Sequence, residues 1–257
     1  MMRKKILALA AAFAAMVAPG ANAATFDAQH DASIFNVVQL GVLGLKGKVT
    51  ASSYSASATM QTAGVANLFG DNRISAASAG PVAPAGLSWT TFSLDHAYGK
   101  KHRQTALARG GAGLSEKVTP PLSNTTANVP VTAAQKAGAR DPVNAILEMS
   151  RTVGRGACSG TYPVFDGKTY YTLALVPKGK APYAMGGYNG EATVCTLRYN
   201  PIAGMKPTTA AERAKIPQGE AYFSAPVDGF ALLISLQVPT PVGLGRIDLK
   251  KYALTAN

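Results

Sequence analysis

The sequence predicts an all-β, mainly antiparallel fold: a single strongly curved sheet, of half-barrel or β-spiral form, with one short helix. Residues 48–62 and 87–98 alternate with a period of two, which indicates strands with two different faces. Glycine, alanine, serine and threonine are abundant and only 15% of residues are charged, which favours strands and turns over long surface helices. Gly41, Gly44 and Gly47 fall in one apolar stretch and favour a strand that bends.

The first set of strands is expected before the helix. These strands are residues 34–47, 48–62, 74–78, 87–98 and 104–109. Residues 24–33 are expected to form a polar entry segment. Residues 114–140 hold Pro120, Pro121 and Pro130 among serine, threonine and asparagine, which predicts a long loop or a mobile crossover.

The one convincing helix is predicted to begin after Asp141. Aspartate is a favourable N-cap, and Pro142 suits the first helical position. Ile146 and Leu147 follow at helical spacing, and Gly154 is suited to end the helix.

The strands after the helix are predicted to begin with a hairpin. Residues 161–165 and 168–176 are rich in β-branched and aromatic residues, and they flank Asp166-Gly167, a pair that favours a type I′ turn. Further strands are expected at residues 191–199, 220–225, 230–238 and 244–249. Nothing divides this series cleanly, so we expect residues 24–257 to form a single β-rich domain.

The N-terminus has the parts of a secretory signal peptide. Residues 3–5 are basic, residues 6–17 form an apolar run, and residues 21–23 place alanine at the −3 and −1 positions. The apolar run is shorter than the ~20 residues that a membrane-spanning helix needs. We therefore predict that residues 1–23 are removed by cleavage between Ala23 and Ala24, and that the protein is exported to a bacterial periplasm.

Cys158 and Cys195 are expected to form a disulfide. Disulfides form and persist in exported proteins, and two cysteines make this pairing the simple inference. The run Gly156-Ala157-Cys158-Ser159-Gly160 imitates a nucleophile elbow, but an elbow needs a strand, a turn and then a helix, whereas here the helix comes first. We favour the disulfide over a thiol nucleophile, and we predict no catalytic residue.

The chain is basic. It holds 25 lysines and arginines against 13 acidic residues, a formal net charge of +12. Removing residues 1–23 takes away three basic residues, so the mature chain has 22 against 13, or +9. Such a charge favours anionic partners, and in a cell envelope these are lipids or acidic polymers rather than nucleic acid. The alternative interpretation is that the charge only aids solubility.

A basic cluster is predicted at one hairpin. Lys100, Lys101, Arg103 and Arg109 form a candidate anion-contact patch for phosphate-bearing lipids. The competing interpretation is an ordinary solvated turn.

The three histidines do not suggest a metal site. Asp95, His96 and His102 are close in the sequence, but adjacent residues of a strand point to opposite faces, so Asp95 and His96 do not converge. Structural zinc sites also use four ligands, usually with cysteines. We predict no metal and no cofactor.

Several stretches, in this order, resemble the proteobacterial domain-of-unknown-function family 3108 (DUF3108). They are DPVNAIL at 141–147, VFDGK at 164–168 and CTLRYNPIAG at 195–204, preceded by the glycine-rich strand and YSASA at 54–58. The resemblance covers most of residues 33–250. It implies an exported β-rich fold related to periplasmic curved-sheet proteins that handle lipids or support envelope integrity, and it carries no catalytic residues.

Together these features predict a non-enzymatic envelope protein that contacts a lipid or an envelope protein and is peripheral at most to the membrane. A concave face that is apolar and open to solvent would favour a lipid, whereas a face filled by side chains would favour a protein partner. The alternative hypothesis is an exported hydrolase, which requires a nucleophile and a histidine that meet in a concave site.

Overall fold

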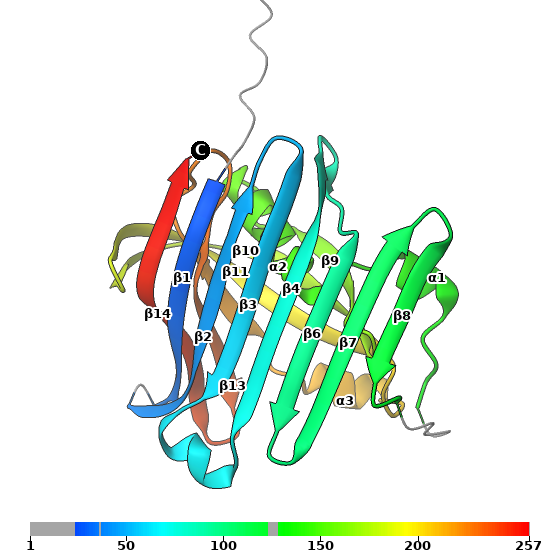
Figure 1. The fold of residues 1–257 in the computed structure, drawn as a ribbon. Helices are drawn as coiled ribbons and strands as arrows, with labels where there is room; N and C mark the ends of the chain where they lie inside the picture. The colour runs from blue at the N-terminus through cyan, green and yellow to red at the C-terminus, as the bar shows by residue number, and fades with distance from the viewer. Residues whose placement is uncertain (1–23, 36, 123–127, 257) are drawn as a thin grey trace, which may run out of the picture.

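The computed structural model describes residues 24–35, 37–122 and 128–256, and they form one antiparallel sheet of fourteen strands that does not close on itself (Figure 1). The strands lie in the order β8-β7-β6-β4-β3-β2-β1-β14-β13-β12-β11-β10-β9, and the short β5 pairs with β4 beside this path. The predicted fold class, a single strongly curved antiparallel sheet, is confirmed.

The strands fall into two sets along the chain. Those before the helical segment are β1 (Ala24–Ile34), β2 (Val38–Val49), β3 (Ser53–Thr62), β4 (Asn72–Ala83), β5 (Gly86–Leu87), β6 (Thr91–Tyr98), β7 (Lys101–Gly110) and β8 (Gly113–Thr119). Those after it are β9 (Gly160–Phe165), β10 (Tyr170–Met185), β11 (Tyr188–Ala203), β12 (Gly219–Phe223), β13 (Leu233–Thr240) and β14 (Gly243–Ala256). The described helices are η1 (Gly64–Phe69), α1 (Ala133–Gly138), α2 (Pro142–Gly154) and α3 (Ala210–Ala214).

The first described strand lies in the middle of the sheet. β1 pairs with β2 on one side and with the C-terminal strand β14 on the other. The sheet grows outward to the edge strand β8, the segment with α1 and α2 crosses to the opposite edge at β9, and the chain then returns strand by strand to β14. In Figure 1, β14 and β1–β8 form a front wall, and β9–β13 form a back wall behind it.

Helix α2 fills the space between the two walls at the upper end of Figure 1. It begins as predicted, because the Asp141 carboxylate accepts a hydrogen bond from the backbone N–H of Asn144 at 2.9 Å and Pro142 opens the first turn. Its side chains Val143 and Leu147 belong to the larger core cluster, whereas Met149 and others belong to a second cluster against the back wall. Each such buried aliphatic side chain contributes roughly 1.5–3 kcal/mol.

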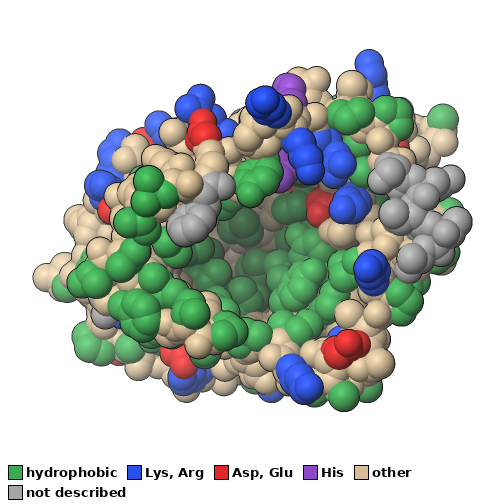
Figure 2. Space-filling view, turned by 90° about the horizontal axis from the view of Figure 1, so that it is seen from below, with side chains coloured by type: hydrophobic (Ala, Val, Ile, Leu, Met, Phe, Trp, Pro, Cys, Tyr) green, Lys and Arg blue, Asp and Glu red, His purple; other side chains and the backbone are tan. Residues whose placement is uncertain are grey.

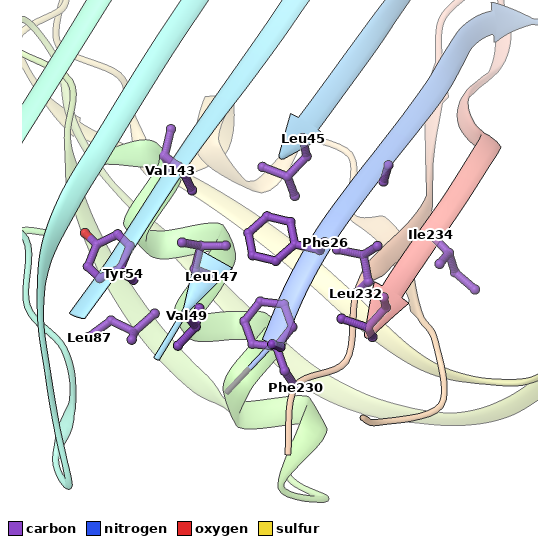
Figure 3. Packing of buried hydrophobic residues seen from close by; sticks show 14 of the residues in the cluster. Phe26, Leu45, Val49, Tyr54, Leu87, Val143, Leu147, Phe230, Leu232 and Ile234 are labelled. Atoms are coloured by element: carbon purple, nitrogen blue, oxygen red, sulfur yellow. The ribbon is translucent and has the colours of Figure 1, made fainter. Parts of the chain in front are cut away.

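The larger core cluster lies between α2 and the front wall (Figure 3). The rings of Phe26 on β1 and Phe230 stack with their centroids 5.4 Å apart. Leu232 and Ile234, which lead into and begin β13, are fully buried beside them. The core therefore joins the centre of the front wall to the segment that enters the back wall.

Two segments that were predicted to lack strands contain them. Residues 24–34 form β1, a central strand, and the polar appearance arises because its buried positions hold small or polar residues such as Ala24, Ala28 and His30. Residues 113–119 form β8, an edge strand that is polar on most positions. The predicted loop at 114–140 also contains α1, whose capping box joins Thr132 and Gln135.

The described chain has three α-helices and one 3-10 helix, of which α2 alone exceeds two turns. One smaller expectation is also corrected. The Asp166-Gly167 turn is longer than a type I′ turn, because strand pairing stops at Phe165 and resumes at Tyr170. The Asp166 carboxylate closes this turn by accepting hydrogen bonds from the backbone N–H groups of Lys168 and Thr169.

Candidate functional site

An open hollow lies between the two walls below α2. Figure 2 looks into it from the lower end and shows a deep depression lined mainly by hydrophobic side chains. Exposure rises towards this end along the inner faces of β3, β6 and β7. On β6 the inner side chains run from buried Phe92 through half-buried Leu94 to exposed Tyr98, and on β3 from buried Tyr54 to half-buried Met60. The hollow therefore widens from the helix towards the solvent.

Strand register identifies the side chains that face the hollow. Residues paired across antiparallel strands share a face, so the inner face is traced outward from the buried positions of β1. Its half-buried apolar residues are Leu43, Met60, Ile74, Leu94 and Val118 on the front strands and Leu173, Leu197, Leu236, Val238 and Ile247 on β10, β11, β13 and β14. They form an aliphatic lining supplied by both halves of the sheet.

Basic side chains stand at the mouth of the hollow. Lys101 pairs with Tyr98 and Arg103 with His96 across the β6–β7 hairpin, so Lys101 and Arg103 share the inner face, and Lys100 lies in the hairpin turn. The Nε atom of Arg103 is buried and has no hydrogen-bond partner. Within the described ranges, no carboxylate lies within ion-pair distance of these three cations. Their charge remains available to an anion.

The fourth predicted patch residue, Arg109, lies elsewhere. It is near the opposite end of β7, where its guanidinium stacks over the ring of Trp89 at 4.1 Å. It also donates hydrogen bonds to the backbone carbonyls of Lys136 at 2.8 Å and Ala139 at 2.6 Å. Arg109 therefore has a structural role, and the candidate anion-contact patch consists of Lys100, Lys101 and Arg103.

The segment that includes Arg109's partners closes the gap between the two sheet edges. Lys136 of α1 pairs with Glu116 on the edge strand β8 at 2.8 Å. The backbone N–H of Arg140 donates to the Pro163 carbonyl, and the Arg140 carbonyl accepts from the N–H of Phe165, both on the other edge strand β9. The β9–β10 turn approaches the front wall as well, because a Cβ added at Gly167 would lie 2.3 Å from the Thr105 side chain. The hollow is thus enclosed laterally although the sheet remains open.

A buried polar network forms the roof of the hollow around the start of α2. Asp141 accepts a hydrogen bond from the Ser78 hydroxyl at 2.6 Å, Ser78 bonds to the Tyr54 hydroxyl at 2.7 Å, and Asn144 donates to Tyr54 at 2.8 Å. Burial raises the pKa of Asp141 to about 6. One turn further along α2, the Glu148 carboxylate accepts a hydrogen bond from the backbone N–H of Leu87. The network fixes α2 to the front wall.

Each of the three histidines makes a hydrogen bond to a different partner. In the described part of the chain, His30 bonds to the Leu233 carbonyl at 3.1 Å, His96 to the Asn72 amide at 2.9 Å, and His102 to Asp95 at 2.9 Å. None of these partners is a serine. Across the same residues, no group of three or more potential metal ligands occurs.

The predicted disulfide between Cys158 and Cys195 is confirmed, with Cα atoms 5.8 Å apart. Cys158 lies just before β9 and Cys195 lies on β11, so the bridge passes over the intervening β10 rather than joining adjacent strands. Both sulfurs lie in the core cluster of the back wall. A bridged, buried Cys158 does not serve as a nucleophile.

Shallow depressions also occur on the outer face of the front wall. They are lined largely by alanine, serine and threonine side chains such as Ser57, Ala77 and Ser93. The titratable residues that line them are Lys46, Asp95 and Lys117. We take the inner hollow, with its aliphatic lining, as the stronger candidate site. None of the described helices has the length and apolar character of a membrane span.

The sequence prediction named Lys100, Lys101 and Arg103, which the structure places at the mouth of the hollow, but it named no residue of the lining. The alternation in residues 48–62 marked one face of β3, yet the pattern does not say which positions lie beyond the reach of α2. Knowing that the helix covers only the upper part of the walls is necessary to separate buried from open inner positions.

Comparison with known proteins supports the fold. The chain is similar to the crystal structure of a β-barrel-like protein of domain of unknown function DUF1849 from Brucella abortus, with a TM-score of 0.57 and 12% identity over 91% of this chain and 98% of that chain. A lipoprotein candidate from Parabacteroides distasonis gives a TM-score of 0.34 at 9% identity, over 89% of this chain and 95% of that chain. No family model and no curated protein matches the chain. The resemblance to DUF3108 stays a prediction, and the likeness to the Brucella protein shows a shared β-barrel-like fold.

Proposed function

We propose that this chain is an exported, non-enzymatic protein of the cell envelope that binds an anionic amphiphile, with the apolar chain in the hollow and the acidic group at its mouth. The observation that carries the proposal is an open hollow with an aliphatic lining (Figure 2). A soluble protein gains nothing from leaving such a surface open unless an apolar ligand covers it.

The charge at the mouth favours an anionic head group. Lys101 and Arg103 face inward beside Tyr98 and His96, and the buried Nε of Arg103 has an unused donor. A guanidinium is suited to carboxylate or phosphate because its donors match two acceptor oxygens at once. Fatty acids and phospholipids share this chemistry of an anionic group joined to an aliphatic chain.

Export is supported by the disulfide between Cys158 and Cys195, which suits an oxidising compartment. N-terminal sequencing of the protein recovered from the periplasm is expected to begin at Ala24.

The proposal is tested by ligand binding to the delipidated mature chain. Native mass spectrometry and displacement of a fluorescent apolar probe by palmitate should show saturable binding. Met60→Glu places a carboxylate in the lining, and it is expected to weaken palmitate binding about tenfold or more, since a charge buried against apolar groups costs well over 1.4 kcal/mol.

Thr59→Glu is the matched control. Thr59 is adjacent on β3 but exposed on the outer face, so the same charge there should leave palmitate binding unchanged. Equal effects of the two substitutions, or no palmitate binding by the unaltered protein, would reject the proposal. The exported hydrolase remains the alternative hypothesis, and the histidine contacts described above give it no support.

A further inference from the structure

The exposed large hydrophobic side chains gather at the open end of the molecule. Ten such side chains occur among the described residues, and all but Met185 and Tyr199 lie in or beside the turns at the lower end of Figure 1. Each lower connection of the front wall supplies at least one. We use the name apolar rim for Phe35, Val37, Leu68, Tyr98, Leu122 and Val242.

The opposite end has a different character. Its turns are short and carry small side chains, as at Ala51 between β2 and β3, Ala85 between β4 and β5, and Ala112 between β7 and β8. No exposed large hydrophobic residue of the described chain lies in these turns. Apolar residues scattered at random over a surface would not favour one end, so the rim indicates a specific contact.

The apolar rim is interleaved with positive charge. Val37 and Leu68 are more than 80% exposed, and the unpaired Lys100 and Lys101 lie next to Tyr98 in the β6–β7 hairpin. Exposed apolar side chains next to lysines are typical of surfaces that bind an anionic bilayer. The apolar side chains enter the boundary of the acyl chains, and the lysines contact phosphate groups.

The spatial arrangement favours a bilayer over a protein partner. The rim residues belong to separate turns along the lower edge of the front wall, beside the mouth of the hollow (Figures 1 and 2). A stable protein interface needs a continuous, well-packed apolar centre, which side chains on separate turns do not offer. A fluid bilayer accommodates separate tips.

We propose that the lower end of the half-barrel docks on an anionic lipid bilayer, with the apolar rim inserted and the mouth of the hollow facing the membrane. This inference goes beyond ligand binding in the hollow, because it assigns a second surface and a partner. When the lower end is docked in this way, an amphiphile passes between the hollow and the bilayer, and the apolar chain of the amphiphile stays out of water.

The test is co-sedimentation of the mature chain with vesicles of phosphatidylglycerol and phosphatidylethanolamine, compared with vesicles of phosphatidylcholine. Stronger binding to the anionic vesicles is expected, and added salt should weaken it. The combined substitutions Val37→Ser, Leu68→Ser and Val242→Ser should weaken binding about tenfold or more by removing the inserted tips. These three side chains are at least 65% exposed, so the fold should be retained.

Two matched controls test whether the position of the apolar and basic side chains matters, and not only their number. Ala51→Leu, Ala85→Leu and Ala112→Leu, added to the rim variant, return three apolar side chains at the wrong end and should not restore vesicle binding. Lys100→Glu with Lys101→Glu should weaken binding, whereas the same charge change at Lys48 and Lys117, which are exposed outside the rim, should have a smaller effect.

Tryptophan fluorescence reports insertion directly. The sole native tryptophan, Trp89, is only 3% exposed and provides a constant background. Leu68→Trp should give a blue-shifted emission that brominated phospholipid quenches, and Ala112→Trp should give neither change.

The outcomes distinguish docking from ligand binding. Met60→Glu protein that loses palmitate but still sediments supports docking as an independent property. Docking is rejected if the unaltered chain binds palmitate but not anionic vesicles, or if the rim variant sediments as well as the unaltered chain. It is also rejected if the rim substitutions instead dissociate a dimer seen by analytical ultracentrifugation.

Discussion

Asp141 is expected to make stability depend on pH between about 4 and 6. Burial raises its pKa from 3.8 to about 6 in the folded protein, so the folded state holds this proton more tightly than the unfolded state does. The contribution of Asp141 to the free energy of unfolding therefore falls as the pH rises through this window, by roughly 3 kcal/mol, and is constant above it. Asp141→Asn keeps an N-cap oxygen but does not ionise.

The measurement is the free energy of unfolding by urea at pH 4 and pH 7 for both proteins. Asp141→Asn should gain stability relative to the unaltered chain as the pH rises. Comparing the two proteins removes the effect of His30, whose pKa is lowered by burial and whose contribution is lost as the pH falls. A difference that is the same at both pH values would contradict the prediction.

At the scale of elements, the contact between α2 and the loop before Phe230 depends on Gly154. A Cβ added at Gly154 would lie 2.3 Å from the Gly229 carbonyl oxygen. Gly154→Ala is therefore expected to destabilise the protein by roughly 1–3 kcal/mol, since the closely packed backbone must move. Gly138→Ala is the matched control, because Gly138 also ends a helix and has nothing within 4 Å of such a Cβ. It should be neutral or slightly stabilising in thermal unfolding.

The disulfide should stabilise the back wall. Cys158 and Cys195 are 37 positions apart, and a loop of that length contributes roughly 3–4 kcal/mol in the chain-entropy model. The double variant Cys158→Ala, Cys195→Ala should lose about this amount in urea unfolding. Unaltered protein kept in a strong reductant should lose a similar amount. An unchanged unfolding midpoint in both experiments would show that the bridge is dispensable.

Elements with a strong local signal were predictable from the sequence. Helix α2 was located by Asp141 and Pro142, and the alternation of residues 48–62 located β3. β1 and β8 were not found. β8 pairs with the adjacent β7, but its positions are mostly polar and exposed, so it lacks an apolar face to mark it as a strand. The strand character of β1 depends on a neighbour that is distant in the sequence. β1 is central because β14, at the other end of the chain, pairs with it. No local pattern encodes that partner.

At the scale of the whole molecule, curvature was predictable but the hollow was not. Abundant glycine and small residues indicated a bent sheet, and the basic hairpin was identified as a candidate contact. The hollow exists because α2 covers only the upper part of two walls whose strands extend further. The prediction wrongly placed Arg109 in the patch with Arg103 for the same reason, because the sequence does not show which part of each strand α2 covers. Six residues of extended strand separate Arg109 from Arg103, a distance of about 20 Å, although both are basic and on one strand.

The segment that carries α1 bridges the two open edge strands β8 and β9, and we call this bridging contact the seam. The seam leads to a prediction about how the whole half-barrel is held together. Arg109 fixes the crossing segment to the front wall through the Lys136 and Ala139 carbonyls and through Trp89. Arg109→Ala removes charge-assisted hydrogen bonds of about 1.5–3 kcal/mol and frees the segment that bridges β8 and β9. Hydrogen exchange should then accelerate at the backbone N–H groups of Arg140 and Phe165, which pair across the seam.

The same substitution should leave the distant half of the sheet protected. The backbone N–H groups that pair β1 with β14 lie far from the seam in the strand order, and their exchange should change only as global stability changes. Lys117→Ala removes a cation from the outer face of β8 without touching the crossing segment, and it should leave the seam protected. Uniform acceleration throughout the sheet would mean that the seam is not a separate unit, and that the open edges are held by the cooperativity of the whole fold instead.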